Sequence, residues 1–240
     1  MLDYTDLKRN PRKFLALTGL TVKEFKALLP AFSEGYRNKY EGSKTLAKRK
    51  RKRQVGGGRI GQLKTTEQKL LFILVHQKTY PLQVVLGELF GLSQTSANQW
   101  IHRLLPVLRQ ALITLGVMPE RDGRKFAQSE RRQRASADYI IDGTERRRQR
   151  PKKPKKQVIH YSGKTKAHTD KNVVIVQTQS KRVGYLSPTR AGKTHDKKVA
   201  DREQITYPRK ATLRKDTGFQ GYEPKVKHSY QAKKNQRAKN

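Results

Sequence analysis

The sequence predicts an α+β protein, with an all-helical N-terminal region that contains a helix-turn-helix and a mixed α/β domain after it. Between residues 65 and 118 the apolar residues recur at the three- and four-residue spacing of helices. After residue 138 they gather in short runs such as Val173–Val176, whose β-branched side chains are typical of buried strands. A formal net charge of +36 indicates a negatively charged partner.

Basic residues dominate the composition, with 55 lysines and arginines against 19 acidic residues in 240. Such an excess attracts phosphate backbones by Coulomb steering and counterion release. An anionic membrane is the competing partner, but the longest purely apolar run, Leu70–Val75, is far shorter than the roughly 20 residues that span a bilayer. Residues 1–15 are too charged for a signal peptide. We therefore expect a cytoplasmic protein that binds nucleic acid and no membrane.

The chain has no cysteine, which excludes disulfides, thiolate nucleophiles and cysteine-based zinc fingers. Its six histidines show no pair at the i, i+4 spacing of a helical zinc site. The hydrophobic content of 34% is low for a globular protein, so we expect a core in only part of the chain.

Residues 1–40 predict an N-terminal helical segment, in which Thr21 caps a helix and Glu24 has the capping-box spacing. Residues 41–64 predict a flexible basic linker, because like charges repel and glycine costs backbone entropy. We predict that its basic run contacts DNA phosphates as a solvated arm, and a nuclear-localisation signal is the alternative in a eukaryotic chain. The run comprises Lys48, Arg49, Lys50, Arg51, Lys52 and Arg53.

Residues 65–118 predict the helix-turn-helix. Thr65 or Thr66 caps its first helix, Gly91 ends the second, and Ser93 caps the third. One face of that third helix is apolar, so we expect Trp100 to be a core residue. The residues of this face are Ala97, Trp100, Ile101, Leu104 and Leu105.

The opposite face of the third helix carries side chains that can recognise bases. Asparagine and glutamine pair with adenine and arginine pairs with guanine, and the N-terminal half of a recognition helix enters the major groove. The alternative is a helical hairpin whose polar face is only solvated. The predicted DNA-contacting residues are Gln94, Thr95, Asn98, Gln99 and Arg103.

Residues 119–137 predict a basic connector, and residues 138–222 predict the mixed α/β domain. The basic stretch 146–156 contains two prolines and predicts an extended loop. A helix is expected after Gly192, with Asp196 near its N-terminus in a capping role rather than as a metal ligand. Residues 223–240 predict a disordered basic tail. The expected strands are Tyr139–Ile141, Val158–Tyr161, Val173–Val176 and Val183–Leu186.

Two aspartates follow short strand-like runs, Asp142 before Gly143 and Asp216 two residues before Gly218. We interpret each as a carboxylate presented at the tip of a strand. Two divalent cations bridged by carboxylate oxygens can clamp the attacking and leaving oxygens of a phosphodiester. The ordinary alternative is an aspartate-glycine turn without chemistry.

Four ordered motifs between residues 138 and 222 resemble the DDE-type insertion-sequence transposases of bacteria, in the IS-four-like and IS-five-like group. They are Asp142–Glu145, then Arg150-Pro151 with Tyr161–Thr169, then Ser187-Pro188 with His195-Asp196, and finally Asp216–Tyr222. The helix-turn-helix resembles the DNA-binding region of the same family.

The resemblance implies a ribonuclease-H-like catalytic domain in which Asp142 and Asp216 are catalytic residues and ligands of Mg²⁺ (or Mn²⁺). It implies double-stranded DNA as the partner, both transposon ends and target, in the bacterial cytoplasm at the nucleoid. A homo-oligomer on the DNA is left open. Lys164 and Lys166 are predicted to contact phosphate, although lysines that protect a strand edge from aggregation are the alternative.

The family's third carboxylate is a glutamate on a helix well beyond the second aspartate. Here the only acidic residue after Asp216 is Glu223, which precedes Pro224, and the printed chain ends at Asn240. We therefore expect an incomplete catalytic domain in a C-terminally truncated, defective transposase, or one of two reading frames. The alternatives are a non-catalytic DNA-binding remnant that inhibits transposition and a basic RNA- or ribosome-associated protein.

Overall fold

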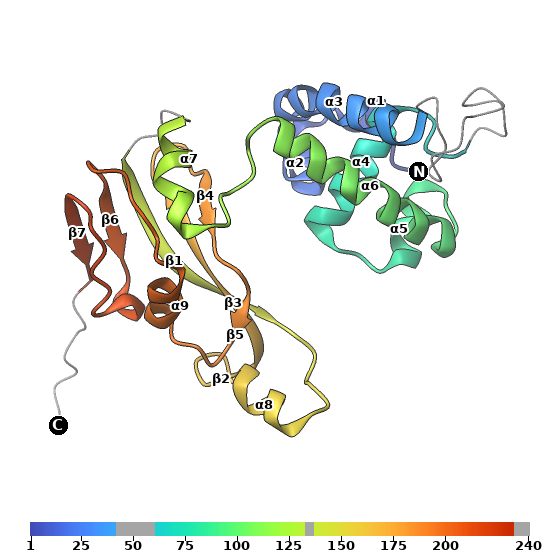
Figure 1. The fold of residues 1–240 in the computed structure, drawn as a ribbon. Coiled ribbons are helices and arrows are strands. Elements are labelled where there is room, and N and C mark those ends of the chain that lie inside the picture. Colours follow the sequence, from blue (N-terminus) through green and yellow to red (C-terminus); the bar gives the residue numbers. More distant parts are fainter. Residues whose placement is uncertain (42–60, 133–136, 233–240) are drawn as a thin grey trace. The chain divides into compact units, whose positions relative to one another are not determined.

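Two separate hydrophobic cores divide the chain into the units Met1–Val117 and Met118–Asn240 (Figure 1). The computed structural model describes residues 1–41, 61–132 and 137–232. The first unit is helical and contains the helix-turn-helix, and the second is a mixed sheet with helices, so the predicted fold class is confirmed. The basic run Lys48–Arg53 lies outside the described residues.

The first unit packs helices from both sides of the predicted linker around one core. Helix α3 lies against α6, and α2 lies against α4, so the segment 1–40 and the region 65–118 are one folded unit. Every residue of Leu70–Val75 in α4 is buried, because helices surround it. The helices are α1 (Tyr4–Leu7), α2 (Pro11–Thr18), α3 (Val22–Tyr36), η1 (Arg37–Glu41), α4 (Thr66–Thr79), α5 (Gln83–Phe90) and α6 (Gln94–Thr114).

The predicted helix boundaries of this unit are confirmed by their capping bonds. The Thr21 backbone N–H donates to Glu24 Oε2 at 2.7 Å and the Glu24 N–H donates to Thr21 Oγ1 at 3.2 Å, which completes the capping box. Ser93 accepts from the N–H of Ser96, and Gly91 ends α5 at a φ of +65°. None of the helices in the described ranges is both long and apolar enough to cross a bilayer.

The second unit is a mixed sheet of order β2-β3-β1-β6-β7, with β4 and β5 also paired to β3. Strand β1 is antiparallel to β3 and parallel to β6, and β6 is parallel to β7, an arrangement consistent with the expected ribonuclease-H-like sheet. The strands are β1 (Asp138–Arg147), β2 (Tyr161–Ser162), β3 (Ala167–Gln177), β4 (Val183–Leu186), β5 (Arg190–Ala191), β6 (Thr212–Lys215) and β7 (His228–Gln231). The helices are η2 (Gly123–Lys125), α7 (Phe126–Arg132), α8 (Pro154–His160), α9 (Asp196–Glu203) and η3 (Thr217–Phe219).

Alternate side chains of the strands build the core of this unit. Tyr139 and Ile141 of β1 are buried, whereas Ile140 between them is 40% exposed. The buried face packs against Phe126 of α7 and Val199 of α9, and Figure 1 shows both helices on the same side of the sheet. The sheet therefore presents one covered face and one more exposed face among the described residues.

Two expectations for the segment after β1 are wrong. Strand β1 does not stop at Ile141 but continues to Arg147, because its whole length pairs with β3. Helix α8 stands where the sequence predicted a loop and then a strand at Val158–Tyr161. Pro154 occupies the first turn of α8. Proline is tolerated there because a backbone N–H at this position would have no partner within the helix, so its absence costs no hydrogen bond.

The predicted basic connector and the predicted disordered tail are each folded in part. The connector 119–137 includes η2 and α7, and Phe126 is fully buried in the second core. The tail 223–240 includes β7, whose polar residues are held by backbone pairing with β6 rather than by burial. Composition did not predict either element. One buried aromatic residue, such as Phe126, or backbone pairing with the edge of a sheet, as in β7, is enough to order a short segment.

We predict that Phe126→Ala lowers the unfolding free energy of the second unit by about 3–5 kcal/mol, the usual cost of emptying a buried phenylalanine site. Hydrogen exchange of β1 and β3 amides would report that loss. Trp100, the only tryptophan, reports on the first unit, so its urea-induced fluorescence transition should not move. Unchanged exchange in β1 and β3 would show that α7 is a mere connector.

Candidate functional site

Parallel pairing of β1 with β6 brings the two predicted catalytic aspartates to the same edge of the sheet. The last paired residues are Ile141 of β1 and Lys215 of β6; Asp142 is the next residue of β1, and Asp216 directly follows the end of β6. The carboxyl ends of parallel strands point the same way, and two residues distant in the sequence thus become neighbours. Asp142 is not at a strand tip as predicted, because β1 continues beyond it along β3.

Each of these aspartates accepts a local backbone hydrogen bond. Asp142 is exposed, and its Oδ1 accepts from the N–H of Gly143 at 2.7 Å. Asp216 caps η3, and its Oδ1 accepts from the N–H of Gly218 at 2.9 Å. A carboxylate has about four acceptor positions, so both groups keep capacity for a cation or a bound water.

A third carboxylate, Asp196 at the start of α9, lies between the two glycines that follow the aspartates. A Cβ placed on Gly143 would lie 2.5 Å from Asp196 Oδ1, and one on Gly218 would lie 3.0 Å from Asp196 Oδ2. Neither position leaves room for a larger residue without movement of Asp196. The sequence predicted the helix and Asp196 near its N-terminus, but not that this side chain reaches the edge.

Lys171 of β3 holds this third carboxylate. Its Nζ lies 2.9 Å from Asp196 Oδ1 and 3.1 Å from Glu145 Oε1, with Glu145 directly opposite on β1. The side chains of Lys171, Glu145 and Asp196 are 8%, 12% and 16% exposed. The sequence did not lead us to predict Lys171. The available signal was its place two residues before Val173, on the same face of the strand as the buried residues of the β-branched run.

The bridge shifts the pKa of two of its members. Burial alone would lower the pKa of Lys171, but the hydrogen bonds and charges of Asp196 and Glu145 outweigh it and raise that pKa. Burial alone would raise the pKa of Glu145, but hydrogen bonds from Ser162, Lys171 and Thr169 lower it. Both charged forms are therefore stabilised by folding.

A cleft of about 430 Å³ lies at the edge of the sheet, and Asp142 is not among the residues that line it. Asp216, Asp196, Glu145 and Lys171 all contribute to its wall. Lys164, predicted to contact phosphate, lines the same cleft from the turn between β2 and β3. Lys166 is exposed in that turn but is not among the residues that line the cleft.

The donor set suits one hydrated cation better than two. Among the residues that the structure describes, no group of three or more histidine, aspartate or glutamate side chains could hold a metal ion. Glu145 and Asp196 are paired with Lys171, whereas no ion pair is found for Asp142 or Asp216 among the described residues. Mg²⁺ keeps several waters and needs only one or two protein carboxylates, so two aspartates are enough by number for a single such ion.

The recognition helix α6 separates its polar and apolar faces as predicted. Ala97, Ile101 and Leu104 are buried, whereas the predicted base-contacting face is open to solvent. On that face Gln94, Thr95 and Gln99 are exposed and Asn98 is half-buried.

Two residues of α6 differ from their predicted roles. Trp100 is only partly buried, so the prediction that it is a core residue is wrong: it packs at the margin of the core. The guanidinium of Arg103 lies 4.9 Å from the Trp100 ring centre and 5.4 Å from that of Tyr40. Cation–π stacking therefore engages Arg103 on these rings, and base contact would require it to leave them.

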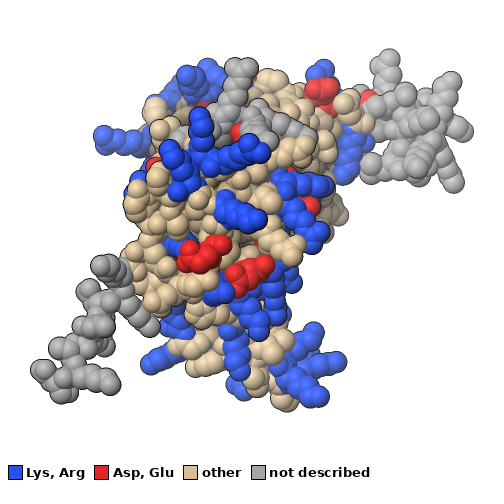
Figure 2. Space-filling view, turned by 60° about the vertical axis from the view of Figure 1, so that its left-hand side comes forward, with Lys and Arg blue, Asp and Glu red and all other residues tan. Residues whose placement is uncertain are grey.

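The exposed surface carries the charge that composition predicts. On the face displayed in Figure 2, lysine and arginine side chains outnumber the acidic ones. Lys164, Lys171 and Lys193 line the cleft together with its carboxylates, so a polyanion meets cationic groups there.

Comparison with known protein families supports the two-part organisation. Residues 61–113 match the helix-turn-helix of DDE superfamily endonuclease, and residues 141–240 match the DDE superfamily endonuclease itself. The first match covers nearly all of α4 to α6, and the second begins one residue before Asp142. Comparisons with curated proteins and with solved structures gave no match. The family matches support a DDE-superfamily endonuclease or transposase, a class that generally uses divalent metals.

We predict that Lys171→Met lowers the unfolding free energy of the second unit by about 3 kcal/mol at neutral pH, because two buried carboxylates lose their cation. Hydrogen exchange of β1 and β3 measures it. Lys197→Met is the matched control: Lys197 makes an exposed pair with Asp201, worth under about 1 kcal/mol.

The pH dependence of the Lys171 effect follows from the pKa directions. The lowered pKa of Glu145 stabilises the fold above the ordinary value of 4.5 and loses its effect as the pH falls through the lowered pKa. The raised pKa of Lys171 stabilises the fold below 10.5 and loses its effect as the pH rises through the raised pKa. The difference between wild type and Lys171→Met should therefore be largest between these limits, and a pH-independent difference would contradict the bridge.

We predict that Asn98→Ala or Gln99→Ala weakens binding to a duplex selected from random DNA by about 1–3 kcal/mol per lost base contact. Binding to unrelated duplexes should change little. Gln110→Ala is the matched control, an exposed glutamine in the later part of the same helix. Equal losses on selected and unrelated DNA would assign Asn98 and Gln99 to backbone contact only.

Proposed function

We propose that the protein is a transposase that binds the terminal inverted repeats of an insertion sequence and takes part in Mg²⁺-dependent DNA cleavage and strand transfer. The observation that carries this proposal is the alignment of Asp142 and Asp216 on neighbouring parallel strands. The family matches over both units support the same class.

Each part of the chain has a distinct task in this proposal. Gln94, Thr95, Asn98 and Gln99 read base edges, and Lys164 holds a backbone phosphate at the cleft. Asp142 and Asp216 hold the metal ion, which would lower the pKa of a bound water and neutralise charge on the phosphate. The bridge of Lys171 to Asp196 keeps the start of α9 against the strand ends.

A second function, DNA binding without cutting, is favoured by the incomplete acidic set. Two aspartates remain for metal binding, and the acidic side chains beside them are paired with Lys171. A second cation would have to be placed by a further carboxylate, and cleavage weakens without it. We therefore propose that the 240-residue chain occupies transposon ends but cleaves them poorly by itself, in the cytoplasm and as a monomer or homo-oligomer on DNA.

We predict that Asp142→Asn and Asp216→Asn each weaken Mn²⁺ binding, followed by the electron paramagnetic resonance of free Mn²⁺, by about tenfold or more. Affinity for DNA in the absence of metal should stay the same, because neither residue lies on α6. Asp6→Asn, an exposed aspartate of the first unit, is the matched control.

Cleavage assays separate the two functions. Substantial Mg²⁺-dependent nicking by the 240-residue chain, lost in both variants, would overturn the proposal of poor cleavage and establish the catalytic roles. Wild-type Mn²⁺ affinity in both variants would overturn the metal-binding roles. Absence of sequence-specific DNA binding would overturn the transposase proposal as a whole.

A further inference from the structure

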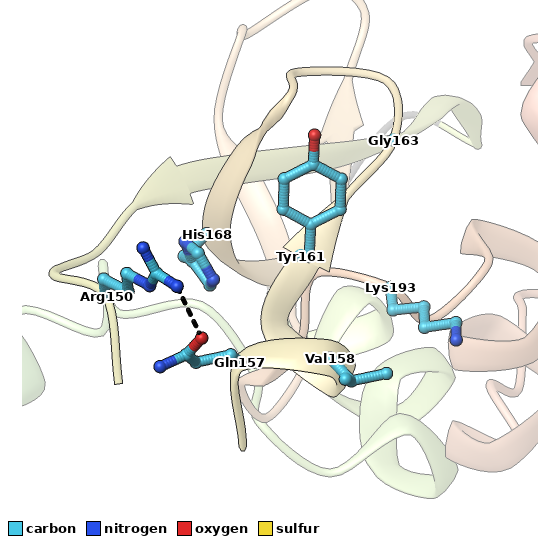
Figure 3. A pocket seen from close by; sticks show the side chains of 7 residues that line it. All are labelled: Arg150, Gln157, Val158, Tyr161, Gly163, His168 and Lys193. Atoms are coloured by element: carbon cyan, nitrogen blue, oxygen red, sulfur yellow. Dashed lines mark hydrogen bonds between the residues drawn. The ribbon is translucent and has the colours of Figure 1, made fainter. Parts of the chain in front are cut away.

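A second cavity, which we call the α8–β2 pocket, opens beside the acidic cleft (Figure 3). Its volume is about 640 Å³, within the range of small-molecule sites and large enough for one nucleotide. Helix α8 contributes Gln157 and Val158, the hairpin of β2 and β3 contributes Tyr161 and His168, and Arg150 and Lys193 complete the wall. The function proposed above gives this pocket no role.

The middle of the α8–β2 pocket is apolar and aromatic. Tyr161 is 45% exposed and Val158 is 58% exposed, although both belong to the folded unit. The rings of Tyr161 and His168 meet edge-on, with centres 5.7 Å apart and planes at 72°. His168 thus steadies the Tyr161 ring and leaves much of it uncovered. An open, fixed aromatic ring is a stacking platform for a nucleobase.

Cationic groups flank this platform. In Figure 3 Arg150 and Gln157 lie to one side of Tyr161 and Lys193 lies to the other. Arg150 Nη2 donates to Gln157 Oε1 at 3.0 Å, and Gln157 Nε2 donates to the Pro151 carbonyl at 2.8 Å. These bonds orient the guanidinium while its other N–H groups stay available for phosphate oxygens. Tyr161 lies between Arg150 and Lys193, an arrangement that suits a base stacked on the ring with a phosphate at each cation.

The α8–β2 pocket adjoins the cleft that Asp216 lines. Tyr161, Gly163 and Lys193 line both cavities. A base stacked on Tyr161 would therefore place its own phosphate close to the cleft that Asp216 and Asp196 line. Because a DNA strand continues beyond the stacked base, its next phosphates can lie along the cleft, which favours a nucleotide of the DNA substrate over a free nucleotide.

A base within a duplex cannot enter such a pocket, because both its faces are stacked. It must be unpaired and turned out of the helix, at a cost that is smallest where it already lacks a partner. From these observations we propose that the α8–β2 pocket binds one unpaired nucleotide of the DNA substrate, with the base on Tyr161 and the phosphates at Arg150 and Lys193. This inference rests on the proposed function and adds a structural preference to it.

The test compares two DNA duplexes that differ at one position. One carries 2-aminopurine as an unpaired bulge, and the other carries it paired with thymine. The full chain should bind the bulged duplex at least about fivefold more tightly, the lower limit of the gain from stacking one base on an aromatic ring. Fluorescence of the bulged 2-aminopurine should fall on binding, because stacking quenches it.

Variants of Tyr161 identify the platform. Tyr161→Ala should remove both the preference and the quenching, whereas Tyr161→Phe, which keeps the ring, should retain them. Tyr230→Ala is the matched control, because Tyr230 is 55% exposed in the same unit but lies outside the pocket lining. Circular dichroism confirms that each variant is folded.

The outcomes separate this inference from the proposed function. Binding of both duplexes with equal affinity, or a Tyr161→Ala variant that behaves as wild type, overturns the inference and leaves DNA binding intact. Binding of free deoxyadenosine monophosphate as tight as that of the bulged duplex overturns it in favour of a free-nucleotide site. Failure to bind either duplex overturns the proposed function, and the inference with it.

Discussion

The parallel pairing of β1 with β6 is the constraint on which the candidate site depends. Parallel neighbours need a long crossover connection, which here contains the four strands β2 to β5 and the helices α8 and α9. The register that aligns Ile141 with Lys215 also buries Tyr139 and Leu213 in one core. A slip by one residue would turn these side chains to the wrong face. The same burial that stabilises the sheet therefore fixes Asp142 beside Asp216.

Bringing several carboxylates to one edge has an electrostatic cost that Lys171 offsets. It faces Glu145 across the β1–β3 ladder and reaches Asp196 at the start of α9, so one cation compensates two acids. Gly143 and Gly218, which follow Asp142 and Asp216, provide the space for this arrangement. Because Lys171 satisfies the inner pair, a divalent ion at the edge would find Asp142 and Asp216 as its ligands.

Features that depend on neighbours in the sequence were predictable, and those that depend on the assembled sheet were not. The cap at Ser93 follows from local hydrogen bonding and the strand at Val173–Val176 from a β-branched run, and both are confirmed. Helix α8 was predicted as a strand because Val158 and Ile159 are β-branched, yet both stay exposed in the helix that Pro154 begins. The position of Asp196 could not be predicted, because it requires three segments to meet.

The basic side chains and the amide side chains of α6 imply different contributions to DNA binding, the first to affinity and the second to sequence specificity. Phosphate contacts from a surplus of lysine and arginine strengthen binding to any DNA and weaken together as salt rises. They cannot distinguish a transposon end from other sequences. In the proposed function, discrimination comes from the polar groups of α6 that we predict to contact base edges, such as Asn98 and Gln99. At the sheet edge a sequence-independent preference for an unpaired nucleotide would act in addition, because it selects a structure of the DNA rather than its sequence. The two selections are therefore separable: changes on α6 alter which duplex is bound, and changes at Tyr161 alter which DNA structure is held beside the carboxylates.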